Sequence, residues 1–149
     1  MKKGFTLLEL VIVMVIVGVL ATLGFTQYGA MVERARGTEA KAILGDLRKF
    51  ATTNRLEYGN LSSATNPFNN TVANIGTAAD NIPSACNSTH YFSYSITSAA
   101  DSTLVATATR CVAGGKTPNR AAGTGAWNLT LTSNLANGSD VWSGTGGYN

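Results

Sequence analysis

An uncharged apolar run near the N-terminus constrains this chain more than any other feature. Residues 10–25 read Leu-Val-Ile-Val-Met-Val-Ile-Val-Gly-Val-Leu-Ala-Thr-Leu-Gly-Phe. With residues 5–8 the block holds about 21 apolar residues, and about 20 residues of helix cross the hydrocarbon core of a bilayer. Backbone groups in lipid must bond within their own segment, so the block is predicted to be helical.

The flanks of this block favour a retained membrane anchor over an ordinary secretory signal. A secretory signal ends in a small-residue cleavage site after its apolar core, whereas here a short Met-Lys-Lys-Gly segment precedes the core. Lys2 and Lys3 predict a cytoplasmic N-terminus by the positive-inside rule, and all residues after 30 then lie outside the cytoplasm. A plain buried helix is the alternative, but 149 residues cannot enclose a helix that is apolar all round.

Composition removes several classes of function. Charged residues make up 13% of the chain and the net charge is +3, of which Lys2 and Lys3 supply two. The remaining body is therefore nearly neutral and shows no clustered basic face of the kind that nucleic acid requires. One His and two Cys leave no conventional zinc site, so we expect no metal and no cofactor.

Glu9 is the one ionisable residue within the apolar block. A charged side chain inside a membrane segment costs several kcal/mol, on the order of 2.5–3.5 on insertion scales for the most costly types. One interpretation is that Glu9 snorkels to the interface. The other is that it pairs with a positive partner inside an apolar assembly.

The segment Gly4-Phe5-Thr6-Leu7-Leu8-Glu9, between a short Lys-bearing leader and the apolar run, resembles the processing site of type IV pilins and related pseudopilins. The resemblance implies that a prepilin peptidase cuts between Gly4 and Phe5 and that the new Phe5 amine is N-methylated. It also implies that Glu9 pairs with the Phe5 ammonium of a neighbouring subunit. Because buried ion pairs often only break even energetically, this pair would set register more than add stability.

Helix-compatible sequence continues past the block to about residue 58. Ala40, Leu44 and Leu47 follow helical spacing, and Gly59 is a plausible left-handed cap. A helix from Thr6 to Tyr58 would be about 80 Å long. Within it, three glycines are read either as packing points between helices or as sites of unwinding during assembly: Gly18, Gly24 and Gly29.

The remainder predicts an antiparallel sheet. Alternation is found in residues 90–97, 103–112 and 126–132, and Asn137-Gly138 predicts a tight turn before a short strand at Val141-Trp142. The expected fold class is α+β with the pilin-like architecture, a long N-terminal helix packed by its C-terminal half on a three- or four-stranded sheet. We expect three parts: a leader at 1–4, a membrane and filament helix at 5–30, and a globular part at 31–149. In the globular part, the helix continues to about residue 58, a loop follows at 59–89, and the sheet covers about 90–142.

Cys86 and Cys111 form an even pair in a part of the chain expected outside the cytoplasm. If Tyr94 lies near Ala106, Cys111 falls beside the start of the first strand, and a disulfide there would staple the base of the hairpin. Such a bridge is worth roughly 3–4 kcal/mol on the chain-entropy model. A catalytic thiol is the alternative, with no paired His in the sequence pattern to support it.

Four weaker signals are each interpreted in the simpler way. Asn137-Gly138-Ser139-Asp140 offers one carboxylate where calcium sites gather several. The loop from Gly114 to Arg120 could touch DNA, although a solvated loop is favoured. His90 is given a structural role. The charges along residues 33–49, including the spaced pairs Arg36/Glu39 and Asp46/Lys49, are assigned to a solvated helix face.

The predicted function is that of a structural subunit, without catalytic residues, of a type IV pilus-like surface filament serving adhesion, twitching motility or DNA uptake. The partners that the resemblance implies are identical subunits, the prepilin peptidase and N-methyltransferase, an assembly platform in the inner membrane, and lipid before assembly. The precursor would be a single-pass inner-membrane protein and the product an extracellular pilus. Two alternatives stay open: the major pseudopilin of a type II secretion system, and a membrane-anchored periplasmic enzyme or binding module.

Overall fold

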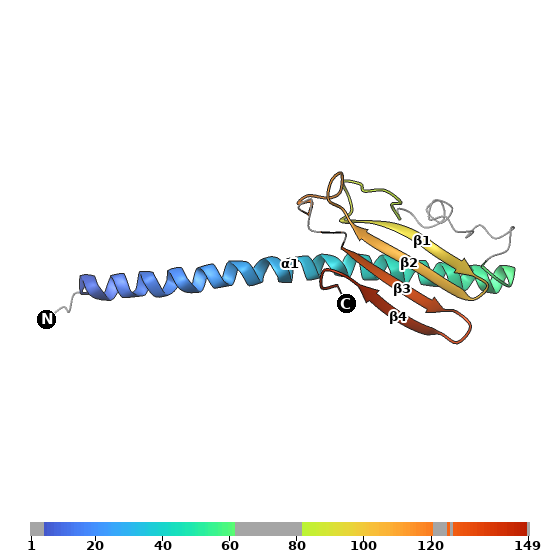
Figure 1. The fold of residues 1–149 in the computed structure, drawn as a ribbon, viewed down its shortest axis with the longest axis horizontal. Helices are drawn as coiled ribbons and strands as arrows, with labels where there is room; N and C mark the ends of the chain where they lie inside the picture. The colour runs from blue at the N-terminus through green and yellow to red at the C-terminus, as the bar shows by residue number, and fades with distance from the viewer. Residues whose placement is uncertain (1–4, 62–81, 121–124, 126, 149) are drawn as a thin grey trace. The chain divides into compact units, whose positions relative to one another are not determined.

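The computed structural model describes residues 5–61, 82–120, 125, 127 and 128–148. It consists of one helix, α1 (Leu7–Tyr58), followed by strands β1 (Phe92–Ala100), β2 (Thr103–Arg110), β3 (Asn128–Asn134) and β4 (Ser139–Gly144) (Figure 1). The fold class is α+β, as the sequence predicts. Of the expected loop at 59–89, residues 62–81 lie outside the described residues, as do the leader residues 1–4.

The chain divides into two compact units, and α1 contributes to both. The first ends at Ala35, and its described part, residues 5–35, is called the stem below. The second begins at Arg36, and its described part up to Tyr148 is called the head. Each unit is described separately.

The four strands of the head form an antiparallel meander in the order β1-β2-β3-β4. Turns of a few residues join β1 to β2 and β3 to β4, and Gly138, with φ of 75°, occupies the second turn as the Asn-Gly signal predicts. The sequence predicts that Tyr94 lies near Ala106, but in the structure Tyr94 pairs with Ala108 and Ile96 pairs with Ala106. The predicted register of β1 against β2 is therefore wrong by two residues. A bulge between Ile96 and Ser98 extends β1 to Ala100 rather than ending it at residue 97.

The other strand bounds differ modestly from prediction. β2 ends at Arg110 instead of Val112, because the chain turns toward the disulfide at Cys111. β3 begins at Asn128, and Trp127 precedes it while still packing against the core. The fourth strand is longer than the Val141-Trp142 pair that was predicted.

One face of the sheet packs on one face of α1. The helix contributes residues at spacings of four, three and four, and the strands contribute the alternating positions that the sequence marks as apolar. Gly59 ends the helix with φ of 85°, and its N–H donates to the Arg55 carbonyl at 2.9 Å, which confirms the predicted cap. The fully buried core side chains are Ala40, Leu44, Leu47, Ala51, Leu61, Phe92, Leu104, Ala106, Ala108, Leu129 and Leu131.

Candidate assembly surface

The first turn of α1 brings Glu9 under the capping residue Thr6. The Glu9 backbone N–H donates to the Thr6 carbonyl at 3.1 Å and to Thr6 Oγ1 at 3.3 Å. This satisfies a donor that the start of a helix leaves without an intrahelical partner. Phe5 and Glu9 are both exposed, and the carboxylate lies in the turn where the helix dipole favours negative charge. Gly4 lies outside the described residues.

The apolar run of the stem, from Leu7 to Phe25, has apolar side chains on every side and is exposed among the described residues. The most apolar 18-residue window of α1 has a mean hydropathy of 2.7 and is 0% buried, so the helix is long and apolar enough to cross a membrane by length and composition. Side chains from all round the helix show this, with Phe5 80% exposed, Met14 75% and Phe25 78%. Large apolar surfaces of this kind mark a lipid-facing or partner-facing region.

The stem glycines open recesses in this apolar surface. A Cβ added at Gly18, Gly24 or Gly29 would meet nothing within 4 Å, and α1 is continuous through all three. Gly24 lines a shallow apolar recess together with Ala21, Phe25 and Tyr28.

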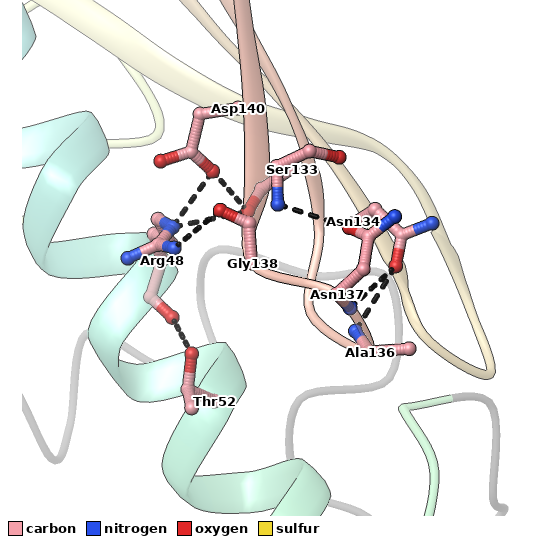
Figure 2. A network of polar contacts seen from close by, with 9 residues as sticks. Arg48, Thr52, Ser133, Asn134, Ala136, Asn137, Gly138 and Asp140 are labelled. Atoms are coloured by element: carbon pink, nitrogen blue, oxygen red, sulfur yellow. Dashed lines mark hydrogen bonds and ion pairs between the residues drawn. The ribbon is translucent and has the colours of Figure 1, made fainter.

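In the head, a polar network joins α1 to the β3–β4 hairpin (Figure 2). Arg48 Nε donates to Asp140 Oδ1 at 2.8 Å and to Ser133 Oγ at 3.1 Å, and Arg48 Nη2 donates to the Gly138 carbonyl at 3.4 Å. The buried Ser133 hydroxyl donates to the same Asp140 oxygen at 2.6 Å. The sequence assigns Arg48 to a solvated helix face and Asp140 to a weak calcium signal. In the structure the two residues instead connect α1 to the β3–β4 hairpin of the head.

The C-terminal residues close the other end of the head. The Tyr148 ring is buried and makes edge-on contacts with Phe92 and Trp127, at centroid distances of 5.4 and 5.7 Å. It also lies directly against α1, since a Cβ added at Gly37 would fall 2.6 Å from Tyr148 Cδ1. Gly37 is therefore required as a small residue where the tail crosses the helix.

A disulfide joins Cys86 to Cys111, whose Cα atoms are 5.8 Å apart. The Cys111 N–H donates to the Tyr91 carbonyl at 2.9 Å, so the bridge lies beside the start of β1 as the sequence predicts. The cysteines are used structurally, and the catalytic-thiol alternative has no thiol to act through. His90 lies in the same region, with Nδ1 2.8 Å from Thr89 Oγ1.

The basic loop after Cys111 is less solvated than expected. The Arg120 side chain is buried, and its guanidinium carbon lies 3.9 Å from the centroid of the Trp127 ring. Arg110 is buried as well and donates to the carbonyls of Tyr91, Cys111 and Pro118. The prediction of a solvated loop is wrong for Arg120, because its guanidinium stacks on an aromatic ring.

The helix charges do not all lie on the solvated face that the sequence predicts, because Glu39 is half-buried against the sheet. Lys49 Nζ lies 2.8 Å from Asp46 Oδ1 on the exposed face, which confirms that spaced pair. Glu39 Oε1 accepts from the Tyr91 N–H at 2.9 Å and so ties α1 to the sheet. Within the described residues, no group of three His, Cys, Asp or Glu side chains could hold a metal ion.

Sequence reasoning found the cap, the disulfide and the exposed apolar helix, and missed the contacts that cross the fold. The contact between Arg48 and Asp140 joins residues 92 positions apart, and no local pattern marks either of them. Tyr148 carried no signal except that it is an aromatic residue near the end of the chain.

Comparisons with known proteins agree with this arrangement. The family model of the prokaryotic N-terminal methylation motif matches residues 1–25. A fimbrial protein of Neisseria meningitidis serogroup B is 40% identical over 80 residues, which cover 54% of this chain and 44% of that protein. A fimbrial protein of Moraxella nonliquefaciens is 41% identical over 54 residues, 36% of this chain and 35% of its own length. The chain thus spans less than half the length of the curated relatives it matches, and no solved structure matches it.

Proposed function

We infer that this chain is a type IV pilin, a structural subunit that polymerises with copies of itself into a surface filament. One observation carries the proposal: the apolar run of the stem has no cover among the described residues, and it has a single carboxylate, Glu9, in the first turn of the helix. Identical stems provide apolar cover of matching length once the stem leaves lipid, and helix packing together with keeping that surface out of water holds the polymer together.

Maturation follows from the same segment. We propose that cleavage between Gly4 and Phe5 removes the two leader lysines and creates an amine at Phe5, which is then methylated. The precursor spans the inner membrane, where the peptidase and the assembly platform act on it. In the polymer Glu9 pairs with the Phe5 ammonium of a neighbouring copy, because each charge alone is costly in an apolar medium.

The head supports a pilus subunit over a calcium-dependent secretion pseudopilin. In the segment considered for calcium, the Asp140 carboxylate already contacts the Arg48 guanidinium. Because this carboxylate is already paired with a cation, we expect a chelator to leave the stability of the head unchanged.

The proposal is tested first by the intact mass of filaments sheared from cells. The expected mass is that of residues 5–149, with one methyl group and with two hydrogens lost to the disulfide. Recovery of the chain only as an unassembled species that retains residues 1–4 would contradict the proposal.

Glu9→Ala tests the assembly step separately. We expect a cleaved, membrane-held subunit whose filament yield falls by at least about tenfold, since a wrong stagger is no longer penalised and a right one no longer gains the pair. The matched control is Glu33→Ala, which removes a carboxylate from the same helix outside the apolar run. Wild-type filament numbers in Glu9→Ala would show that the pair is dispensable.

A further inference from the structure

The head carries its charges unevenly along the strands. Between residues 82 and 149 the only carboxylate side chains are Asp101 and Asp140, and the cations are Arg110, Lys116 and Arg120. The β1–β2 and β3–β4 turns lie at one end of the antiparallel meander, and Asp101 and Asp140 lie at those turns (Figure 1). At the opposite end of the meander, Arg110 is the last residue of β2, and Lys116 and Arg120 come after it in the chain.

The turn end, called the acidic end below, also receives the C-terminus of α1. The Leu61 N–H donates to the Asp101 carbonyl at 3.3 Å, which places residues 57–61 beside the β1–β2 turn. Glu57 and Asp101 are exposed there, and Asp140 forms an ion pair with Arg48. The helix C-terminus adds partial negative charge to this end, and Arg55 supplies one cation, donating to the Leu135 carbonyl.

The opposite end, called the basic end below, is organised around the half-buried ring of Tyr91. Arg36, Arg110 and Lys116 each place a cationic group 5.0 Å from its centroid. Arg36 and Arg110 are partly or wholly buried, and Lys116 is exposed. The aromatic ring holds these like charges together by attracting each of them.

Arg120 adds a fourth cation to the basic end, stacked on Trp127. Within the described head, α1 contributes one carboxylate to this end, Glu39, which accepts from the Tyr91 N–H. The described basic end thus holds four cations against one carboxylate, and the head is a dipole aligned with its strands and with its part of α1.

We propose that the basic end of one head docks on the acidic end of the head of a second copy, with Lys116 facing Glu57 and Asp101. This inference rests on the proposed filament, because copies related by a translation along a polar polymer present opposite ends to each other. Exposed ion pairs add little stability each, but charge complementarity selects orientation and register and penalises the reversed contact. The partner is identified by its charge: the acidic end is the complement of the basic end on the same chain.

Wild-type filaments allow a direct test by carbodiimide coupling, which joins a lysine amine to a contacting carboxylate without a spacer. Lys116 and Glu57 lie at opposite ends of one head, so a peptide linking them must come from two copies. We expect a Lys116–Glu57 or Lys116–Asp101 linked peptide in filaments and not in detergent-dispersed subunits. Filaments in which Lys116 couples to neither residue would overturn the proposal.

Charge reversal gives the second test. Lys116→Glu and Glu57→Lys are each expected to lower filament yield about fivefold at 0.15 M salt, and the double variant is expected to recover to within about twofold of wild type, because the swap restores complementarity. The single-variant defects should shrink at about 1 M salt, where screening acts over about 3 Å. Lys41→Glu, at an exposed position of α1 between the two ends, is the matched control and should assemble like wild type.

The outcomes separate this docking contact from the filament proposal. Absence of wild-type filaments would refute the proposed function itself. If wild type forms filaments, two results would refute the contact alone. One is normal assembly of both single variants, and the other is no recovery of filament yield in the double variant. The amount of each variant in the membrane and the oxidised state of Cys86 and Cys111 report whether its head folds. If a charge-reversal variant does not fold, the neutral variants Lys116→Gln and Glu57→Gln replace it.

Discussion

The stem and the head use the same helix in opposite ways. Along the apolar run of the stem, from Leu7 to Phe25, the large apolar side chains are about half exposed or more, as at Leu10 (55%) and Met14 (75%). Along the head one stripe of α1, including Leu44 and Leu47, is 0% exposed against the sheet. A helix that is apolar all round needs a partner on every side, whereas an amphipathic helix needs one core. Within the described residues, the head therefore covers the apolar face of its part of α1, whereas the apolar run of the stem is left exposed.

Polar groups follow the same division. In the head, carboxylates have partners within the chain: Asp46 with Lys49, Glu39 with a backbone N–H, and Asp140 with Arg48. In the apolar run, Glu9 makes its contacts through its backbone at the start of the helix. Folding thus accounts for these three carboxylates of the head, and the proposed assembly accounts for Glu9.

Truncating one apolar side chain in each region should show the difference between the stem and the head most strongly. Leu44→Ala leaves a cavity in the head core and is expected to lower the free energy of unfolding by about 2–5 kcal/mol. Val13→Ala removes a comparable side chain from the exposed stem and should leave head unfolding unchanged. The measurement is denaturant unfolding of the full chain in detergent, followed by Trp127 fluorescence. Equal effects of the two variants would contradict the separation of folding from stem packing.

Two glycine substitutions within the head part of α1 compare a position that is covered by the C-terminal residues with one that is open. Gly37→Ala drives a methyl group against the Tyr148 ring, 2.6 Å from Cδ1, and is expected to destabilise the head by about 1–3 kcal/mol. Gly45→Ala meets nothing within 4 Å and should stabilise the helix by up to about 1 kcal/mol. Thermal unfolding of both variants checks the opposite signs. Stabilisation by Gly37→Ala would show that the C-terminal tail does not lock against α1.

Local patterns account for what the sequence predicted correctly. The end of α1 at Tyr58 follows from Gly59, the β3–β4 turn from Asn137-Gly138, and the core positions of the strands from alternation. The assembly residues Phe5 and Glu9 come from a motif of six adjacent residues, and their pairing and the cut after Gly4 stay predictions.

Contacts between distant segments account for what was missed. The register of β1 against β2 depends on a bulge between Ile96 and Ser98, which alternation does not reveal. Arg48 is one of several cations on α1, and only the packed hairpin selects it as the partner of Asp140. A buried Arg120 could be inferred only from the position of Trp127, which is set by the sheet.

The smallest expected effect concerns a polar atom inside the head core. Tyr94 is 1% exposed, and its hydroxyl has no hydrogen-bond partner within the described structure. Burial raises the pKa of Tyr94 far above its ordinary value, and the nearby Glu39 carboxylate raises it further. Tyr94→Phe removes an unsatisfied buried donor and should stabilise the head by about 1 kcal/mol at pH 7.

The pH dependence of the same variant has a definite sign. The unfolded chain releases the Tyr94 proton at its ordinary pKa of about 10, whereas the folded chain holds it, so folding becomes less favourable as pH rises above about 10. Tyr94→Phe lacks this loss, and its stability advantage should therefore widen between about pH 10 and 11. Denaturant midpoints of both proteins across that range provide the measurement, since the other tyrosines titrate in each and cancel in the difference. A constant gap between the two proteins would show that the Tyr94 phenol ionises in the folded head as easily as in the unfolded chain.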